Sequence, residues 1–337
     1  MNAKNYYNPE GMDPLDETML GANGTGFLDF NKSKYEWAGK IYKNMSALTW
    51  FPSQVDTSEE SKDVSLLSDN ELAIYKLTFA QLSFNDSIQT NYILDFRAQT
   101  TNSVVKAVLA RQAWEEANHN DSYSVLLDAA GNSDEVFNLY KTDDMLDRKN
   151  RRISEQFARN IDGGSVDKLL LSAMASVNLE GIYFLLGFGY IYTLGDKVPG
   201  ARDMIKEIAA DELQTHLPLF SNIFKTIKRE NKILTSTVDT CISMLEEAVD
   251  IELEYGNYLI ERYPILGLTK DMMEDTIHNY ANQRLTALGL PHIYDTKDVT
   301  HIQKLVTKFN KLNDTKTNFF EGNVSNYSKG SIDMNNF

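Results

Sequence analysis

The chain has 337 residues and only one cysteine, Cys241. A single thiol excludes an intrachain disulfide and any metal site built from several cysteines. Cys241 lies in the stretch TCISMLEEAV, which has a helical pattern. We therefore interpret it as a half-buried packing residue and not as a catalytic nucleophile.

Positive charge is also scarce. Lys and Arg total 33 against 48 Asp and Glu, and the formal net charge is -15. Because non-specific nucleic-acid binding depends on a basic surface, we expect no nucleic-acid partner. A glycine-rich phosphate-binding loop is missing as well, so we expect no nucleotide to bind to this chain itself.

Apolar runs long enough for a membrane are absent. The N-terminal stretch MNAKNYYNPEG lacks the apolar core of a signal peptide. The most apolar stretch, LEGIYFLLGFGYIYTLG, contains Glu180 and is shorter than the about 20 apolar residues that a membrane span needs. These features predict a buried core helix, no membrane partner and a cytoplasmic protein.

Helical periodicity dominates the rest of the chain. Apolar residues recur at helical spacing through residues 34–51, 68–96, 103–131, 134–160, 167–194, 201–230, 235–262 and 270–288. Pro218 lies inside one of these segments and predicts a kink, a local irregularity or a break. Since 42% of the residues are hydrophobic, a large core can form. We predict an all-α fold with an irregular segment over 1–30, one helical domain over 31–312 and a flexible tail over 313–337.

Two pairs of acid and histidine stand out in these helices. Glu116 and His119 are three residues apart, so both side chains lie on one helix face and can bind one ion. Tyr123 follows about 6 Å further along the same face. Glu212 and His216 form a second pair, with a spacing of four that again places both on one face. Either pair alone is weak evidence, because a solvated carboxylate beside a hydrogen-bonded histidine is common.

Two further acids lie in apolar helical surroundings. Asp86 occurs in LSFNDSIQT, and Glu180 precedes the run Ile-Tyr-Phe-Leu-Leu. A buried carboxylate is costly unless it is paired or binds a metal, although Glu180 could also be a carboxylate at a helix N-terminus. Of the five histidines, His278, His292 and His301 fall outside the pattern, and we interpret them as surface or packing residues.

Four helices with four carboxylates and two histidines are typical of the ferritin-like bundles that hold two iron or two manganese ions. Oxygen and imidazole ligands suit these metals. The predicted ligands are Asp86, Glu116, His119, Glu180, Glu212 and His216.

At this level of detail the sequence resembles the radical-generating small subunit of class I ribonucleotide reductase. The resemblance runs from about Lys34 to Phe337 and rests on TWFPSQVD, FNDSIQTN, RQAWEEANHNDSY, NLEGIYFLLGFGY, IAADELQTH and NFFEGNVSNYSKGSID, in that order. It implies a dinuclear centre of two iron ions, with two manganese ions or one of each as alternatives, activated by O2 or a related oxidant. It also implies a homodimer that works with a separate large subunit.

The resemblance assigns roles to individual residues. Asp86, Glu116 and His119 would bind one metal, and Glu180, Glu212 and His216 the other. Tyr123 would carry the radical, shielded by the apolar side chains of Phe184, Phe188 and Ile208. Trp50 and Asp211 would connect the site to the surface, and Tyr327, in the tail that docks on the large subunit, would hand the oxidising equivalent over.

The second pair departs from the family pattern, which has Glu-x-x-His where this chain has DELQTH. Three readings are open: both side chains reach the metal from a regular helix, a π-bulge absorbs the extra residue, or Leu213 takes the place of the glutamate and Glu212 is displaced. We favour Glu212 as the ligand because the Asp-Glu pair is intact. Ala210 also replaces a basic residue that is common in the family.

Other functions are compatible with a dimetal bundle. An oxidase, hydroxylase or desaturase of the same fold would need neither Tyr327 nor a docking tail. A ferritin-like metal store would give Tyr123 no purpose. A helical scaffold without metal would leave the burial of Glu180 unexplained.

Overall fold

The computed structural model describes residues 7–131, 133–161, 165–264, 269–296 and 304. Within these residues the chain is helical and forms no strand; one isolated β-bridge pairs Met12 with Gly24. The prediction of an all-α fold is confirmed. The tail over 313–337, with Tyr327, lies outside the described residues.

The α-helices are α1 (Glu36–Ala47), α2 (Glu60–Ser65), α3 (Asp69–Gln99), α4 (Ser103–Ala129), α5 (Ser133–Thr142), α6 (Asp144–Ile161), α7 (Val166–Asn178), α8 (Leu185–Leu194), α9 (Pro199–Asp211), α10 (Leu217–Glu230), α11 (Thr235–Arg262) and α12 (Lys270–Leu288). Short helical turns η1 (Pro52–Gln54) and η3 (Gly195–Lys197) connect some of them. Two π-helical segments, η2 (Leu179–Tyr183) and η4 (Glu212–His216), join α7 to α8 and α9 to α10.

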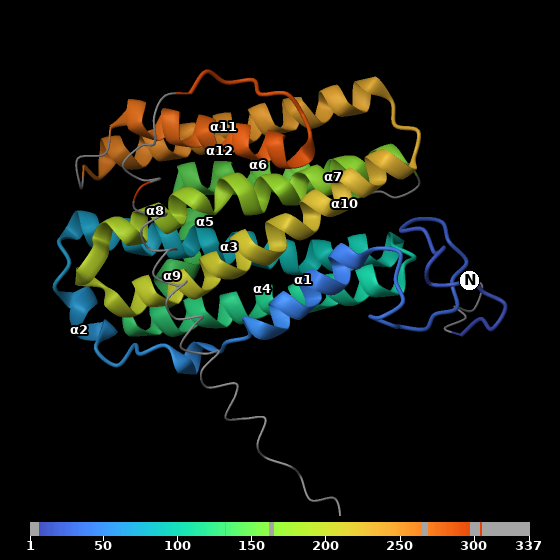
Figure 1. Cartoon of the computed structure of the whole chain (residues 1–337). Coiled ribbons are helices and arrows are strands. Elements are labelled where there is room, and N and C mark those ends of the chain that lie inside the picture. The colour runs from blue at the N-terminus through green and yellow to red at the C-terminus, as the bar shows by residue number, and fades with distance from the viewer. Residues whose placement is uncertain (1–6, 132, 162–164, 265–268, 297–303, 305–337) are drawn as a thin grey trace, which may run out of the picture.

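The long helices run side by side in one elongated bundle (Figure 1). Helix α3 packs against α4, and α7 packs against α10 and α11. Helices α11 and α12 lie on one side of the bundle and α1 on the other, against α4 (Figure 1). Residues 7–35 contain no helix and fold against one end of the bundle. The arrangement is a ferritin-like bundle with additional helices.

Side-chain caps explain where several helices begin. Ser68 and Glu71 form a capping box at the start of α3. The Asn102 side chain accepts hydrogen bonds of 3.1 Å from the backbone N–H groups of Val104 and Val105 at the start of α4. The short connection between α3 and α4 makes them an antiparallel pair, which places Asp86 and Glu116 on neighbouring helices.

Two predicted helix boundaries are wrong. The helix predicted over 34–51 ends at Ala47, and Phe51 is extended with φ -134° and ψ 149° before the turn at Pro52. A residue before proline is driven out of the helical region by steric contact, so the helix cannot run on to Phe51 as predicted. The helix predicted over 134–160 is two helices, because the Asp143 side chain accepts hydrogen bonds from the backbone of Met145 and Leu146 and starts a new helix.

The irregularity predicted at Pro218 is confirmed as the π-helical segment η4, which ends two residues before this proline. Proline has no N–H group to donate to the carbonyl four residues earlier, which belongs to Gln214. That carbonyl instead accepts a hydrogen bond of 3.5 Å from the Asn44 side chain on α1. The π-helical segment η4 therefore contacts α1 through the Gln214 carbonyl.

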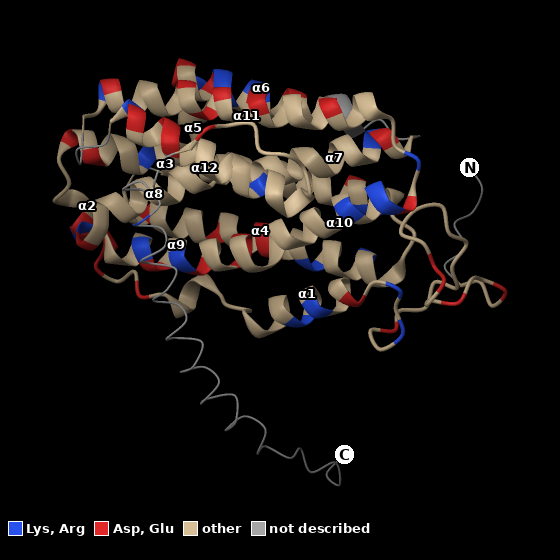
Figure 2. Ribbon diagram, turned by 45° about the horizontal axis from the view of Figure 1, so that its top comes forward, with Lys and Arg blue, Asp and Glu red and all other residues tan. Residues whose placement is uncertain are grey.

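The most apolar segment is a core helix, as predicted. Residues Val166–Lys197 are long and apolar enough to cross a membrane, but 94% of their most apolar window is buried inside the protein. Acidic and basic residues are distributed over most of the helices (Figure 2).

Candidate metal centre

The six predicted ligands meet in the middle of the bundle. Asp86 comes from α3, Glu116 and His119 from α4, Glu180 from η2, and Glu212 and His216 from η4. Each of these side chains is completely shielded from solvent. The structure thus brings together all six residues, although they span 131 positions of the sequence, from 86 to 216.

The ligands form two overlapping groups. In the first, one ligand atom each of Asp86, Glu116, His119 and Glu212 lies within 4.8 Å of the others. In the second, the same holds for Glu116, Glu180, Glu212 and His216. Because Glu116 and Glu212 belong to both groups, they are placed to bridge two ions, and the cluster is consistent with a dinuclear metal site.

The extra residue between Glu212 and His216 is absorbed by the π-helical segment η4. Of the three readings of DELQTH, the π-bulge is the one that the structure adopts. His216 Nδ1 lies 2.9 Å from Glu212 Oε2 and 3.3 Å from Glu116 Oε1, whereas Leu213 packs against the hydrophobic core. Glu180 lies in a second π-helical segment, η2, which the sequence analysis did not predict. Both segments lie at the cluster, where such bulges often mark functional sites.

In the part of the chain that the structure describes, several buried polar atoms of the cluster lack hydrogen-bond partners that bound cations would replace. Both carboxylate oxygens of Asp86, one oxygen each of Glu116, Glu180 and Glu212, and Nδ1 of His119 have no aligned hydrogen-bond partner among the described residues. Leaving so many acceptors buried without a partner costs several kcal/mol, at about 1–3 kcal/mol for each group. Two divalent cations would satisfy these atoms together.

The ionisation of the cluster reflects the same crowding of acids. Burial, together with the charge of neighbouring carboxylates, raises the pKa of Asp86 and of Glu180 well above the ordinary values. Burial alone would lower the pKa of His216, but the charge of Glu212 and of Glu116 outweighs it and raises the pKa well above its usual range. Burial alone would raise the pKa of Glu212, but the charge of His216 holds this pKa far below its ordinary value.

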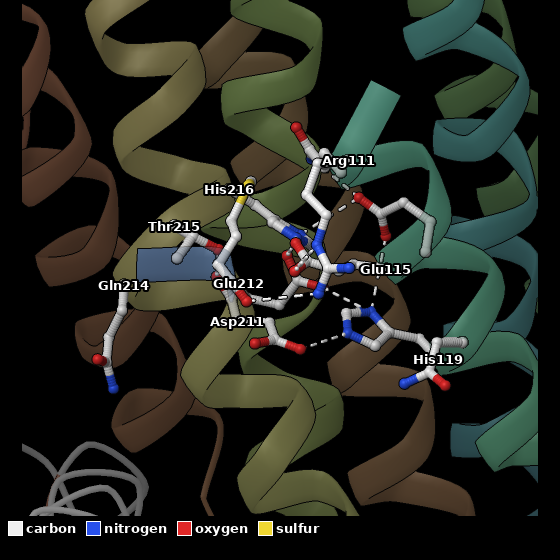
Figure 3. A network of polar contacts seen from close by, with 12 residues as sticks. Arg111, Glu115, His119, Asp211, Glu212, Gln214, Thr215 and His216 are labelled. Carbon is white, nitrogen blue, oxygen red and sulfur yellow. Dashed lines mark hydrogen bonds and ion pairs between the residues drawn. The ribbon is translucent and has the colours of Figure 1, made fainter. Parts of the chain in front are cut away.

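A hydrogen-bonded chain leads from the cluster toward the surface. His119 Nε2 lies 3.2 Å from Asp211 Oδ2, and the indole Nε1 of Trp50 donates a hydrogen bond of 2.8 Å to the same oxygen (Figure 3). The rings of Trp50 and His119 are stacked, with centroids 6.2 Å apart. Trp50 is 6% exposed, which places it at the edge of the core. The structure therefore joins Trp50 to His119 through the Asp211 carboxylate.

Tyr123 is completely buried on α4, one helical turn after His119. Its hydroxyl group has no aligned hydrogen-bond partner among the described residues. Burial and the neighbouring Asp86 carboxylate raise the pKa of Tyr123 well above its ordinary value, so the phenol stays protonated. Phe184, Phe188 and Ile208 are also fully buried, and the ring of Phe79, which the sequence analysis did not single out, lies 5.8 Å from that of Tyr123.

Several polar residues around the ligands escaped the sequence analysis. Gln89 and Gln112 donate hydrogen bonds of 2.7 and 2.9 Å to the same oxygen of Glu180. Glu115 lies 2.9 Å from His216 Nε2 and pairs with Arg111. Nothing in the spacing of Gln89, Gln112 and Glu115 marks them as site residues, because the ligands Glu180 and His216 that they contact lie on other segments. Glu115 stands beside another acid, Glu116, and two adjacent acids on a helix usually indicate a solvent-exposed face.

Local contacts away from the cluster account for His278, His292 and Cys241. The His278 ring stacks on Tyr294 with centroids 4.0 Å apart, and His292 Nε2 lies 2.7 Å from the Thr286 hydroxyl oxygen. His301 lies outside the described residues. Cys241 is completely buried, more than the half-burial expected from the sequence.

The bundle and its buried carboxylate and histidine side chains define the class of ferritin-like dimetal-carboxylate proteins. Residues 28–301 match the family "Ribonucleotide reductase, small chain". The chain therefore belongs to the ribonucleotide reductase small-chain family.

Similar proteins carry related names. The chain is 33% identical over 322 residues to "Ribonucleoside-diphosphate reductase subunit beta" of Treponema pallidum, which covers 93% of this chain and 91% of that protein. It is 31% identical over 324 residues to the protein of the same name from Halalkalibacterium halodurans, with 94% and 92% covered. A solved structure, "Ribonucleotide reductase R2 subunit from Clostridium botulinum", superposes with a TM-score of 0.84 at 29% identity and covers 92% of this chain and 99% of that one.

Proposed function

We propose that this chain is the radical-generating subunit of a ribonucleoside-diphosphate reductase, and that it stores the radical on Tyr123. The observation that carries the proposal is the buried cluster of six ligands, with Tyr123 one turn beyond His119 and Trp50 joined to His119 through Asp211. Neither a metal store nor a metal-free scaffold accounts for this combination.

The metals are proposed to be two iron ions, with two manganese ions or one of each as alternatives. Asp86, Glu116 and His119 would hold one ion, and Glu180, Glu212 and His216 the other, with Glu116 and Glu212 in reach of both. When bound, the two metals and O2 or a related oxidant supply the one-electron oxidising power.

The protein residues determine where that oxidising power goes. Tyr123 would give up an electron to that oxidant and its hydroxyl proton to the neighbouring Asp86 carboxylate, and its complete burial would keep water and reductants away from the radical. Asp211 holds the His119 imidazole and the Trp50 indole in fixed orientation. We propose that the oxidising equivalent leaves through His119, Asp211 and Trp50, and then through Tyr327 to the large subunit.

The partner of this family of subunits is the large, catalytic subunit. We propose that residues 313–337 form a flexible tail that docks there, that residues 31–312 form the helical domain, and that two copies of the chain form a homodimer in the cytoplasm. Truncation after residue 312 should abolish ribonucleotide reduction with the large subunit and leave the radical signal unchanged. Sedimentation of the full chain measures the homodimer.

Electron paramagnetic resonance tests the radical assignment. After reconstitution of the metal-free protein with Fe(II) or Mn(II) and O2, we expect a tyrosyl signal that Tyr123→Phe removes. Tyr183→Phe is the matched control, because Tyr183 is equally buried but lies on η2, and the signal should persist. Full ribonucleotide reduction by Tyr123→Phe would contradict the tyrosyl radical and favour an oxidant held by the metals themselves.

A further inference from the structure

Two of the four ligand-bearing segments, α4 and the junction of α9 with η4, each carry a pair of adjacent acids. In both pairs one acid faces the cluster and the other contacts the histidine of the opposite segment. In Glu115-Glu116 on α4, Glu116 faces the cluster and Glu115 contacts His216 of the other helix. In Asp211-Glu212, Glu212 faces the cluster and Asp211 contacts His119 on α4. The first acid of each pair therefore orients the histidine that the opposite helix supplies.

Each of the two imidazoles turns Nδ1 toward the cluster and Nε2 toward a carboxylate outside it. His119 turns Nδ1 toward Glu212 at 3.1 Å and its outer nitrogen, Nε2, toward Asp211 at 3.2 Å. His216 turns Nδ1 toward Glu212 at 2.9 Å and Nε2 toward Glu115 at 2.9 Å. An imidazole whose outer N–H is held by a carboxylate is fixed in one tautomer and is a more basic metal ligand.

Glu115 itself is anchored by a cation. Arg111 Nε donates a hydrogen bond of 3.0 Å to Glu115 Oε1, the oxygen that does not face His216 (Figure 3). The guanidinium also donates 2.6 Å to the Thr49 hydroxyl oxygen and lies 4.2 Å from the ring centroid of Trp114. The Glu115 side chain is 4% exposed and that of Arg111 18% exposed, so the pair closes the cluster on the side of α1.

We propose that Glu115 is the positioning residue for His216, that Arg111 holds Glu115 in place, and that the pair sets the metal affinity of the His216 position alone. This inference rests on the proposed function only in taking His119 and His216 as metal ligands. Asp211, which contacts His119 and Trp50, serves the other position, so the two positions depend on different outer residues. The loss of such an outer carboxylate typically weakens metal binding about 10- to 100-fold.

Variants that retain one histidine separate the two positions. In the His119→Ala background the remaining metal depends on His216, and Glu115→Ala should lower its Mn(II) affinity about 10- to 100-fold. In the His216→Ala background Glu115→Ala should leave the affinity unchanged. Glu115→Gln, which keeps an acceptor for His216 Nε2–H, should restore part of the loss, and Arg111→Gln should cause a smaller loss than Glu115→Ala. Calorimetric titration with Mn(II) measures each affinity.

The same substitution is measured in the otherwise unchanged chain. Glu115→Ala should still bind one Mn(II) tightly and should bind the second about 10- to 100-fold more weakly, seen as free Mn(II) in the paramagnetic resonance spectrum. Glu60→Gln is the control for the loss of a buried carboxylate, because Glu60 contacts Tyr75 and the start of α9 and not the cluster. Its two affinities should stay unchanged.

Two outcomes overturn the inference. One is unchanged binding of both Mn(II) ions by Glu115→Ala, and the other is an equal loss in the two single-histidine backgrounds. Failure of the metal assignment, on which the inference rests, looks different, since the unaltered chain would then not bind two Mn(II) ions at all; failure of the radical assignment would appear as a missing tyrosyl signal with both Mn(II) affinities intact.

Discussion

The Trp50 indole nitrogen and the Asp211 carboxylate, 161 residues apart in the chain, are joined by a hydrogen bond of 2.8 Å. Asp211 also contacts His119, so one carboxylate links a candidate ligand to an aromatic side chain at the edge of the core. The early end of α1 makes this contact possible, because the non-helical residues after Leu48 bring Trp50 to Asp211 at the end of α9 and to His119 on α4.

Replacement of the Trp50 indole should leave metal binding intact and abolish delivery of the radical to the large subunit. Trp50→Phe keeps an aromatic ring in the core but removes the N–H group. We expect two bound metals and an unchanged radical signal, and ribonucleotide reduction with the large subunit reduced to background. Loss of a hydrogen bond to a charged group should lower the free energy of unfolding by about 1.5–3 kcal/mol. Trp37→Phe, on α1 away from the cluster, is the control and should retain activity.

The π-helical segment η4 should tolerate the loss of one residue. Gln214 is exposed and points away from the cluster (Figure 3), and its deletion would convert the spacing of Glu212 and His216 from four to three. Both spacings place the two side chains on one helix face, so we expect two metals to bind and the thermal midpoint to stay equal or rise.

A deletion within regular helix is the contrasting case. Removal of Asn222 from α10 rotates the rest of that helix by about 100° and takes its apolar face out of the core. We expect this variant to unfold at a much lower temperature. If both deletions had the same effect on metal binding and on the thermal midpoint, η4 would not be the place where an extra residue is absorbed.

A second prediction about stability concerns Lys149 on α6 and Glu252 on α11. Their charged groups are 2.6 Å apart and buried, with 2% and 1% of the side chains exposed. Lys149→Met leaves the Glu252 carboxylate without its partner and should cost about 3–5 kcal/mol, whereas Lys149→Met with Glu252→Gln should cost little or stabilise the protein. Urea unfolding of the single and double variants measures both.

The pH dependence of the single variant has a definite sign. Burial already raises the pKa of Glu252 in the folded protein, and without Lys149 the opposing attraction is gone. A carboxyl group whose pKa is higher in the folded than in the unfolded state contributes stability at low pH that is lost as pH rises. Lys149→Met should therefore be more destabilised at pH 8 than at pH 5. An equal loss at both values would mean that Glu252 stays charged without Lys149.

Cys241 should react only when the protein unfolds. Burial raises the pKa of its thiol to about 12, so that only about one thiol in 10⁴ is ionised at pH 8. Labelling with a thiol-specific reagent should be slow in the folded protein and rise in parallel with unfolding by urea. Fast labelling without urea would show that α11 opens locally.

Much of the helical structure could be predicted from the sequence, because helical periodicity is a local property. The predicted segments 235–262 and 270–288 coincide with α11 and α12. The same period places Glu116 and His119 on one face of α4, and it identifies Glu180 as an acid in an apolar helix. These features need only residues a few positions apart.

The contacts between helices were decided by the tertiary structure alone. Helical periodicity cannot predict that Glu115 contacts His216, which lies 101 residues further along the chain. Nor can it predict that Asp211 contacts Trp50, 161 residues away. The π-helical segment at Glu180 was also out of reach, because no extra residue or proline marks it. The sequence by itself determined which side chains could bind metals, and the packing of α3, α4, η2 and η4 decided that they meet, since only burial among these four elements brings their carboxylates within reach of the same two ions.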